Sequence, residues 1–398
     1  MLERYVTLLC NITVRVWILT CLIAVAGKLN AAQFEPGVQV GAVESLLVNE
    51  ASGIAASGSN SDVLWVHNDS GDSARVFAMN IQGTHLGIYN LTGAGATDWE
   101  DMAVGPGPVP DQSYLYLGDI GDNNAVRTSI QVYRVAEPVV SSTQSPVTEN
   151  LDGVEKIELQ YPDGARDAET LMIDPLTNDI YIVSKRESQS RLYRAAYPQS
   201  TVSTNIMEYI TQLPCSWTTG GDISPDGDEI ILRWRILALR RDEALFWSRP
   251  SGGDLWDAFD QPGQSVPLVL TEPQGEAICF DPSGYGYYTT SENKDQGPHQ
   301  PIYYFERIWT PGDANRDDCV DVVDLGILAA HYGTTSGAEW EDADFNGDGK
   351  VDASDLGLLA TYYGSVSSGA SSQAVPEPNM IIMLAVGSCV ICLARRRS

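Results

Sequence analysis

The longest region of the chain, from Phe34 to Trp309, is patterned as strands. Short apolar runs rich in β-branched and aromatic residues alternate there with Gly, Pro, Asn and Asp turns, and an apolar period of 3.6 residues is absent. When the segments are aligned, the same order of a first, second, third and outer strand recurs five times. Equivalent positions of the five first strands are Ile54, Met102, Leu171, Ile223 and Ile278, at steps of 48, 69, 52 and 55 residues.

Four strands per repeat at this spacing predict a β-propeller over residues 33–309 and a mainly β chain. Five blades are the direct interpretation. Six stay open, because the 69-residue step is long enough to contain extra structure. The strand predicted for residues 38–48 would complete the last blade, and this closure removes the unpaired edges of an open sheet. A β-sandwich is the alternative, and the regular repeat disfavours it.

After residue 309 the pattern changes to two short helices, each preceded by an acidic loop. Apolar residues recur at helical spacing in both, and each helix ends at a glycine, Gly333 or Gly364. The loops align without gaps and start 31 residues apart, at Asp313 and Asp344. Loop positions 1, 3, 5, 7, 9 and 12 hold Asp313, Asn315, Asp317, Cys319, Asp321 and Asp324 in the first loop and Asp344, Asn346, Asp348, Lys350, Asp352 and Asp355 in the second.

These are the positions from which an EF-hand loop directs oxygens at one Ca²⁺, with position 7 contributing its backbone carbonyl. Oxygen ligands without His or thiolate favour calcium over zinc. Two departures from sensor EF-hands are Asp instead of Glu at position 12 and Asp318 instead of glycine at position 6. Because position 6 needs a sharp turn, we expect the first site to bind calcium more weakly than the second. A solvated acidic turn is the alternative, which the duplication disfavours.

The paired loops and helices resemble the two half-motifs of a dockerin domain. The resemblance covers residues 311–364, within a predicted domain of residues 310–364. It implies a small α-helical domain with two calcium ions and a cohesin-like module as partner. It also implies that the partner is recognised by the pairs at the helix starts, Val322 with Val323 and Ala353 with Ser354. These pairs differ, so the two faces need not be equivalent.

Both ends of the chain carry targeting patterns, and the first is that of a signal peptide. Arg4 and Arg15 precede an apolar run over residues 16–27 and the small residues Ala31 and Ala32. This order predicts a signal peptide over residues 1–32. A retained N-terminal anchor is the alternative, but the apolar run is short for a membrane span.

At the other end, a Ser/Gly-rich linker over residues 365–374 leads to a Pro-Glu-Pro sequence at 376–378, an apolar run over residues 380–394 and three arginines. Residues 375–398 resemble a PEP-CTERM sorting tail. The resemblance implies a C-terminal transmembrane helix that anchors the protein transiently in the inner membrane, and an exosortase-type processing protease. It places the protein in the periplasm, at the cell surface or in the extracellular matrix. An ordinary C-terminal anchor is the alternative.

The chain has 24 Lys and Arg against 53 Asp and Glu, a net charge of −29. This excess argues against nucleic acid as a partner, because phosphates require a basic footprint. It fits a calcium-rich exterior, where cations offset the repulsion between carboxylates. Between the two terminal segments the cysteines are Cys215, Cys279 and Cys319, and both a Cys215–Cys279 bridge and two buried thiols stay open.

Glutamates recur at one position of the propeller repeat. Glu100, Glu169 and Glu276 begin equivalent first strands, and in a propeller the second strands end at the same face, around the channel. Because like charges brought close must be protonated or hold a cation, a calcium site there is one hypothesis. Its candidate residues are Asn68, Glu100, Asp119, Glu169, Asp222, Glu276 and Glu292. The alternative is that such carboxylates tie neighbouring blades together through backbone N–H groups.

The repeat loosely resembles the calcium-dependent phytase-like and lactonase-like (SMP-30) propellers, which also place Glu at blade starts. The sequence contains no Ser-His-Asp order, Gly-rich phosphate loop or zinc motif, and it identifies no catalytic residues. Two functions stay open for this exported, surface-sorted calcium-binding protein. In the first, the propeller binds a ligand or glycan and the dockerin docks it to a cohesin-like partner. In the second, it is a calcium-dependent hydrolase of a phosphoester, lactone or polysaccharide, carried into an extracellular assembly.

Overall fold

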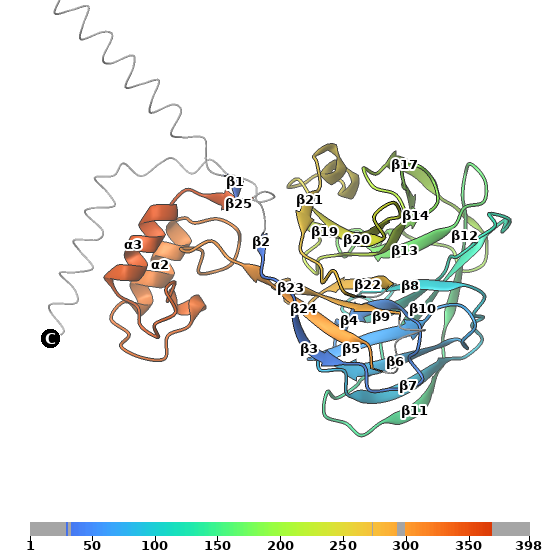
Figure 1. The fold of residues 1–398 in the computed structure, drawn as a ribbon, viewed down its shortest axis with the longest axis horizontal. Coiled ribbons are helices and arrows are strands. Elements are labelled where there is room, and N and C mark those ends of the chain that lie inside the picture. Colours follow the sequence, from blue (N-terminus) through green and yellow to red (C-terminus); the bar gives the residue numbers. More distant parts are fainter. Residues whose placement is uncertain (1–28, 31–32, 273, 293–298, 368–398) are drawn as a thin grey trace, which may run out of the picture. The chain divides into compact units, whose positions relative to one another are not determined.

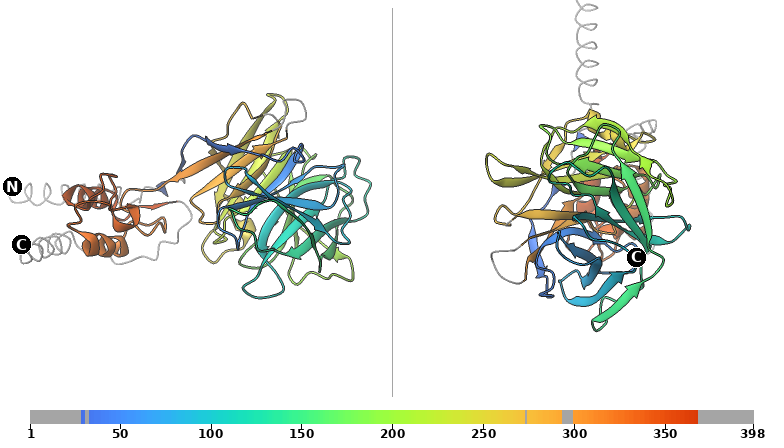
Figure 2. Two further views of the ribbon diagram at one scale, coloured as in Figure 1. Left: turned by 90° about the horizontal axis from the view of Figure 1, so that it is seen from below. Right: turned by 90° about the vertical axis from the view of Figure 1, so that its right-hand side faces the viewer.

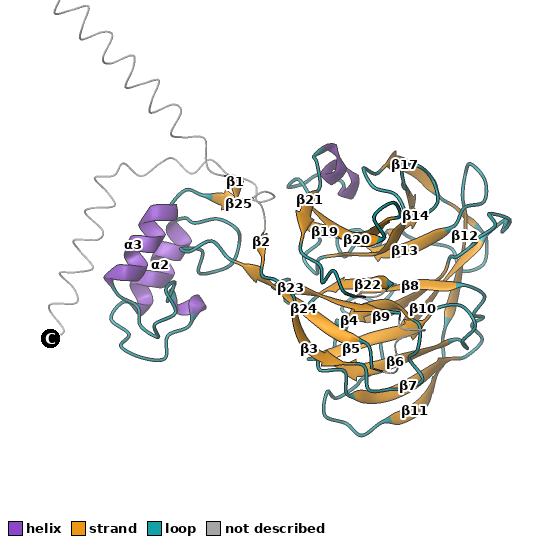
Figure 3. Cartoon of the chain, viewed as in Figure 1, coloured by secondary structure: helices purple, strands orange, loops and turns teal. Residues whose placement is uncertain are grey.

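The computed structural model describes residues 29–30, 33–272, 274–292 and 299–367. The predicted sorting tail and all but Leu29 and Asn30 of the predicted signal peptide lie outside these residues. The described chain divides into two compact units, residues 33–308 and a second unit that contains residues 309–367 together with Leu29 and Asn30. Strands build the first unit, and the helices α2 (Val322–His331) and α3 (Ala353–Tyr362) belong to the second (Figure 3).

Five sheets of consecutive antiparallel strands form a five-bladed β-propeller (Figures 1 and 2). Blade 1 contains β4 (Ala51–Ala56), β5 (Val63–Asn68), β6 (Arg75–Asn80) and β7 (His85–Leu91). Blade 2 contains β8 (Trp99–Pro106), β9 (Ser113–Asp119), β10 (Ile130–Ala136) and β12 (Glu155–Gln160). Blade 3 contains β13 (Ala168–Ile173), β14 (Ile180–Ser184), β15 (Arg191–Ala195) and β17 (Glu208–Gln212). Blade 4 contains β18 (Thr218–Ile223), β19 (Glu229–Ile236), β20 (Arg241–Ser248) and, after the 3₁₀-helix η1 (Leu255–Asp260), β21 (Gln264–Val266). Blade 5 contains β22 (Gly275–Phe280), β23 (Gly286–Ser291) and β24 (Pro301–Ile308).

The start of the propeller closes the ring. The N-terminal strands β2 (Gln33–Phe34) and β3 (Val38–Ala42) both pair with β24, and the first strands contact one another in the order β4, β8, β13, β18, β22 and back to β4. The strand predicted over residues 38–48 is too long, because β3 ends at Ala42. Beyond it, the backbone N–H of Glu44 donates to the carbonyl of Gly83 in the β6–β7 turn.

Within the described residues, the 69-residue step contains no sixth blade. After β10 the chain returns to blade 1, where β11 (Val147–Leu151) lies parallel to β7, and only then does β12 complete blade 2. The short strand β16 (Asn205–Ile206) pairs with β12 in the same parallel manner. The extra residues of the 69-residue step therefore cover the exposed edge of blade 1, and β16, from the following step, covers that of blade 2, which limits pairing with other chains.

Each blade has a β-bulge at the start of its first strand, opposite the end of its second strand. The register shifts lie between Ala51 and Gly53, Trp99 and Asp101, Ala168 and Thr170, Thr218 and Gly220, and Gly275 and Ile278. The polar residues inside these bulges are Ser52, Glu100, Glu169, Thr219 and Glu276, all of them buried. A bulge turns a side chain away from the face of the strand to which the alternation would direct it. Because every blade has such a bulge, polar groups lie at the same end of the five first strands.

The apolar cores lie between neighbouring blades. Trp65 of β5 and Leu117 of β9 belong to one cluster, and Tyr181 of β14 and Leu232 of β19 to another. Cys215 and Cys279 are buried in different clusters and carry free thiols. Each blade is thus held mainly by burial against the next one.

The second unit consists of two repeats that exchange backbone hydrogen bonds. Gly333, at the end of α2, donates to the carbonyl of Val351 at 2.9 Å, and Gly364, at the end of α3, donates to that of Val320 at 2.8 Å. The 3₁₀-helix η2 (Trp340–Asp342) lies between the repeats, and β1 (Leu29–Asn30) pairs with β25 (Val366–Ser367). Both glycines have positive φ, +95° and +80°, as helix C-termini favour.

Among the described residues, no helix is long and apolar enough to cross a membrane. The predicted C-terminal transmembrane helix lies outside them.

Candidate metal centres

The first acidic loop is closed by the carboxylates at its first and last positions. Asp313 accepts hydrogen bonds from the backbone N–H groups of Asp317 at 3.1 Å and Asp318 at 3.0 Å. Asp324, in the first turn of α2, accepts from the N–H of Ala314 at 2.8 Å through one oxygen and from that of Asp321 at 2.7 Å through the other. Both ends of the loop are therefore held next to the same group of carboxylates.

The second loop repeats this scheme. Asp344 accepts from the N–H of Gly349 at 2.6 Å, and Asp355 accepts from those of Phe345 at 3.0 Å and Asp352 at 2.9 Å. In both loops the residue at position 9, Asp321 or Asp352, is also the N-cap of the following helix. Matching bonds in two segments 31 residues apart mean that the repeat seen in the sequence is also a repeat of structure.

The carboxylates of these loops fit a hard divalent cation. Asp313, Asp324, Asp344 and Asp355 are all 3 % exposed or less. Burial raises the pKa of Asp313 to about 7, and repulsion from Asp324 and Asp317 adds to the effect. Crowded, buried carboxylates become favourable as anions when a cation lies between them, and an all-oxygen donor set suits Ca²⁺.

In each loop the residues that would hold the ion are those at positions 1, 3, 5, 7, 9 and 12. They are Asp313, Asn315, Asp317, Cys319, Asp321 and Asp324, and Asp344, Asn346, Asp348, Lys350, Asp352 and Asp355, with Cys319 and Lys350 contributing their backbone carbonyls.

The two loops differ at their left-handed positions. Position 6 has φ of +63° at Asp318 and +79° at Gly349, and position 4 has φ of +58° at Arg316 and +70° at Gly347. The first loop thus carries two side chains where the second has glycine. The strain at Asp318 was expected from the sequence, whereas that at Arg316 was not, because position 4 is not a ligand position. Arg316 is held by an ion pair with Glu341 at 2.8 Å.

We predict that Asp318→Gly strengthens calcium binding at the first loop. A non-glycine residue in the left-handed region costs about 1 kcal/mol, so relieving it is expected to lower the Kd by roughly five-fold. Calorimetric titration of a Gly349→Ala variant provides the matched control, in which the second site should weaken. Unchanged or weaker binding at the first loop of Asp318→Gly would contradict the ranking of the two sites.

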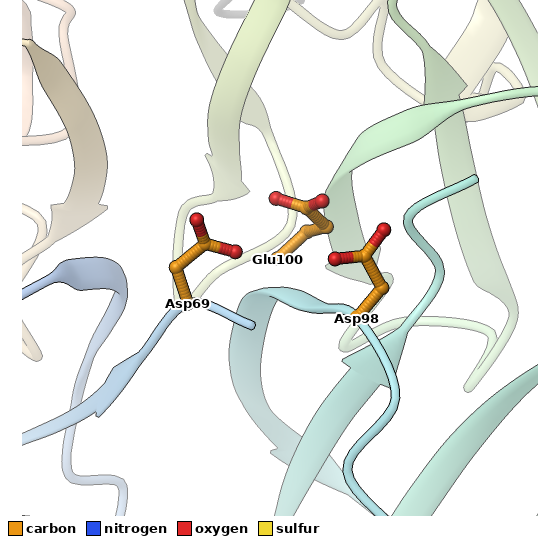
Figure 4. Close-up of side chains that lie close together, drawn as sticks. All are labelled: Asp69, Asp98 and Glu100. Carbon is orange, nitrogen blue, oxygen red and sulfur yellow. The ribbon is translucent and has the colours of Figure 1, made fainter. Parts of the chain in front are cut away.

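A second group of carboxylates meets at the bulged end of the propeller strands. Asp69 follows β5, Asp98 precedes β8, and Glu100 occupies the bulge of β8. One ligand oxygen from each lies within 4.8 Å of the other two, and the three carboxylates face a common space (Figure 4). Of the predicted channel residues, Glu100 is the member of this cluster.

The cluster is electrostatically unfavourable for anions alone. Burial raises the pKa of Glu100 well above its ordinary value, Asp69 and Asp98 raise it further, and Lys185 acts in the opposite direction. Burial and the neighbouring Asp69 also raise the pKa of Asp98. Burial and the neighbouring carboxylates therefore favour the protonated form of Glu100 when no cation lies between them.

Glu169 occupies the equivalent bulge of blade 3 but is neutralised differently. One of its oxygens forms an ion pair with Lys185, whose ammonium group also lies 5.8 Å from the centre of the Trp217 ring. Among the described residues, no hydrogen-bond partner reaches the other Glu169 oxygen. Glu169 therefore does not belong to the three-carboxylate cluster, although the same lysine, Lys185, interacts electrostatically with both Glu169 and Glu100.

Two predicted channel residues hold loops in place. Asn68 accepts from the backbone N–H of Asn49 at 3.0 Å and donates to the carbonyl of Leu47 at 2.7 Å. Asp119 accepts from the N–H of Asp98 at 3.2 Å and pairs with Arg127 at 2.8 Å. Asp119 thus positions the segment that carries Asp98.

Glu276 and Glu292 lie together at the corresponding end of blade 5. Gln274 donates to Glu292 at 2.9 Å, and Glu276 shares a hydrogen bond with Glu292. Burial raises the pKa of Glu276, and Lys185 opposes this shift. The bulges place Glu100, Glu169 and Glu276 at the same end of the first strands, but the close three-carboxylate group is Asp69, Asp98 and Glu100.

Asp222 ties neighbouring blades together. It accepts from the backbone N–H of Phe280 in blade 5 at 2.9 Å, and Asp101 in blade 2 accepts from that of Leu171 in blade 3 at the same distance. Burial outweighs these bonds and raises the pKa of Asp222 to about 7. This is the structural role that the sequence offered as an alternative.

This burial predicts a pH dependence of stability. Between roughly pH 4 and 7 the folded propeller keeps a proton on Asp222 that the unfolded chain releases, so stability from this group is present at low pH and lost as pH rises through 7. Asp222→Asn is neutral throughout. The Tm of the variant relative to wild type should therefore rise from pH 4 to 7.5 in calcium, and exposed Asp111→Asn serves as the control. A constant difference would mean that Asp222 does not titrate in this range.

Comparison with known proteins agrees with the geometry of the second unit. Residues 311–362 match the Dockerin type I domain family and form a dockerin domain after a five-bladed β-propeller. No curated protein matches the sequence.

Several solved structures are similar to the chain at low identity. A luciferin-regenerating enzyme is 10 % identical, with 69 % of this chain and 95 % of that chain covered and a TM-score of 0.38. The hydrazine synthase of Kuenenia stuttgartiensis is 14 % identical (61 % and 65 % covered, TM-score 0.31), and a structure of a nidogen/laminin complex is 12 % identical (61 % and 73 %, TM-score 0.35).

Proposed function

We propose that the chain is an exported, surface-sorted calcium-binding protein whose dockerin domain docks a ligand- or glycan-binding propeller onto a cohesin-like module. The observation that carries this proposal is the pair of half-motifs with matching loop hydrogen bonds and exchanged backbone bonds between Gly333 and Val351 and between Gly364 and Val320. Dockerin domains as a family bind calcium and cohesins. Two calcium ions, one in each loop, are part of the proposal.

The docking surface that we propose lies at the helix starts. Val322 and Val323 are 55 % and 50 % exposed, although both are large and apolar, and the equivalent Ala353 and Ser354 are exposed as well. Exposed apolar side chains next to polar neighbours are typical of protein interfaces. Because only the first pair is strongly apolar, we expect it to contribute more to binding.

The test is a titration of the full chain against a panel of cohesin modules in calcium and in EGTA. Binding should require calcium and fall at least ten-fold in a Val322→Asp/Val323→Asp variant, whose new acidic side chains suit a helix N-terminus and preserve folding. The matched Ala353→Asp/Ser354→Asp variant should lose less. Binding by no cohesin in the panel, or binding that persists in EGTA, would contradict the proposal.

Export and sorting belong to the same proposal and rest on the sequence patterns of residues 1–32 and 375–398. We propose processing by an exosortase-type protease and transient anchoring through the C-terminal segment, with the periplasm, cell surface or extracellular matrix as destination. Mass spectrometry of the mature protein tests this. A chain that retains both terminal segments in the secreted fraction would contradict it.

A second candidate function is that of a calcium-dependent hydrolase. The observation in its favour is the group of three carboxylates at the channel end, of which Asp69 and Asp98 are only half buried. A catalytic metal needs such an open coordination position for water or substrate. Phosphoesters, lactones and polysaccharides are the substrates to assay, with Asp98→Asn as the variant that should abolish any activity found.

A further inference from the structure

The hairpin between β19 and β20 of blade 4 (Figure 1) extends beyond the strands on either side of it. β18 pairs with β19 as far as Trp234, and β21 pairs with β20 from Ala244 onwards. Past these points β19 and β20 continue as a two-stranded ribbon to Ile236 and Arg241. The ribbon lies on the bulged side of the propeller, because the bulge of β18 starts at Thr218, opposite Trp234. Side chains on such a projecting hairpin add little to the core and are accessible for binding.

A cavity of about 250 Å³ lies between this hairpin and the segment that leads to blade 5. Arg235, Arg240 and Arg241 line it from the hairpin, and residues 268–272 and Gln274 line it from the segment. Pockets for drug-sized ligands measure roughly 300–1,000 Å³, so this cavity fits one charged unit of a larger molecule. Three arginines around one small cavity stand out in a chain with 24 Lys and Arg against 53 Asp and Glu.

The acidic side chains of the cavity are neutralised from within the propeller. Asp242 and Glu272 also line the cavity, and they lie 3.3 Å and 2.9 Å from Nη2 of the buried Arg233. Arg235 pairs with Asp242 as well, at 2.9 Å. The negative charges of the cavity are therefore compensated before any ligand binds.

Arg240 carries a guanidinium without an acidic partner. Arg241 pairs with Glu243, but among the described residues none accepts a hydrogen bond from the exposed side chain of Arg240. The backbone of Arg240 has φ of +51°, in the left-handed region that favours glycine or asparagine. A strained position that no contact within the described chain compensates indicates a functional role.

We propose that this cavity binds the anionic group, a carboxylate or a sulfate, of an acidic polysaccharide, with Arg240 as the main contact and Arg235 and Arg241 beside it. The planar fork of an arginine can donate two parallel hydrogen bonds to a carboxylate such as that of a uronic acid. The proposal rests on the propeller half of the proposed function and names the chemical class of its ligand.

Shape and charge favour a polysaccharide strand over an anionic membrane. A single strand reaches the projecting hairpin alone, whereas a flat anionic surface would also approach the carboxylates on the bulged side of the propeller, such as Asp69 and Asp98. The net charge of −29 opposes that approach. Leu237 and Leu239 at the hairpin tip are exposed apolar side chains of the kind that contact lipid, so vesicles form one arm of the test.

The test is calorimetric titration of the full chain with oligogalacturonate in EGTA, which excludes calcium bridges between carboxylates. The wild-type chain should bind, and added NaCl should weaken the binding. Arg240→Asn should weaken it at least ten-fold, because it removes the unpaired guanidinium. Since asparagine tolerates the left-handed backbone, the Tm of this variant should equal or exceed that of wild type, which separates lost binding from lost folding.

The matched control is Arg191→Gln, which removes an arginine that pairs with Asp163 in blade 3 and should leave binding unchanged. Dextran sulfate and neutral dextran are titrated in parallel. Binding of dextran sulfate instead of oligogalacturonate, lost in Arg240→Asn, would support the cavity and identify sulfate as the anionic group. Binding to phosphatidylglycerol vesicles without binding to either acidic polysaccharide would overturn the polysaccharide as ligand.

Two further results separate this site from the proposed function. Glycan binding that Arg240→Asn leaves unchanged would overturn the cavity but keep the propeller as a glycan-binding module. Binding of no glycan, charged or neutral, would overturn both. Cohesin binding in calcium should be the same for Arg240→Asn and wild type, because docking depends on the dockerin domain.

Discussion

Removing calcium from the full chain is expected to unfold the dockerin domain and to leave the propeller folded. Without the ion, buried carboxylates such as Asp313 and Asp324 repel each other, and the ten-residue helices α2 and α3 are too short to persist alone. The ion therefore supplies folding energy directly. The propeller keeps its large apolar clusters between blades in either condition.

Far-ultraviolet circular dichroism in EGTA measures this effect, because α2 and α3 are the α-helices of the described chain. The helical signal should disappear and return with calcium, while the strand signal stays. An Asp313→Ala/Asp344→Ala variant should lack the helical signal even in calcium. A helical signal indifferent to EGTA would mean that the domain folds without metal.

The second large effect is expected at the ion pair of Arg233 and Glu272 inside the propeller. Arg233 donates to Glu272 at 2.9 Å and lies 3.3 Å from Asp242, and the side chains of Arg233 and Glu272 are 1 % and 0 % exposed. Arg233→Met leaves a buried carboxylate without its partner. We expect a loss of about 3–5 kcal/mol in the free energy of unfolding.

Two variants separate this explanation from a loss of packing. Arg233→Met/Glu272→Met removes both charges and should recover most of the lost stability. Arg235→Met, on the same strand and 27 % exposed in its side chain, removes a pair with Asp242 and should cost at most about 1 kcal/mol. Equal losses in Arg233→Met and the double variant, measured by denaturant unfolding, would argue that the charge is not the cause.

The repeats are the part of the architecture that the sequence predicts well. Calcium loops are local, so twelve consecutive residues contain every ligand position, and the duplication from Asp313 to Asp344 reinforces the assignment. The propeller is predicted for a related reason, since equivalent residues such as Met102 and Leu171 recur in each blade. The strand over residues 38–48 was predicted too long because contacts of Glu44 with the β6–β7 turn are non-local.

The grouping of the channel carboxylates could not be predicted in the same way. A β-bulge at Glu100 leaves no mark in the polar–apolar alternation, because residues 99–103 of β8 are all buried, and the pairing of Glu169 with Lys185 depends on rotamers. The sequence places Asp69 at a second-strand end and Asp98 at a first-strand start, both facing the channel, but it does not show that these two carboxylates meet Glu100. Asp222 was a site candidate, yet its distance to Phe280 in the next blade gives it a structural role.

The central claim is that each of the two acidic loops is a calcium site and that the two ions hold a docking module together. Native mass spectrometry of the full chain in calcium tests it most directly. The wild-type chain should carry one ion in each loop besides any ion bound by the propeller, and Asp313→Ala and Asp344→Ala should each lose one ion, with both losses adding in the double variant. A calcium count that neither substitution changes would contradict the account.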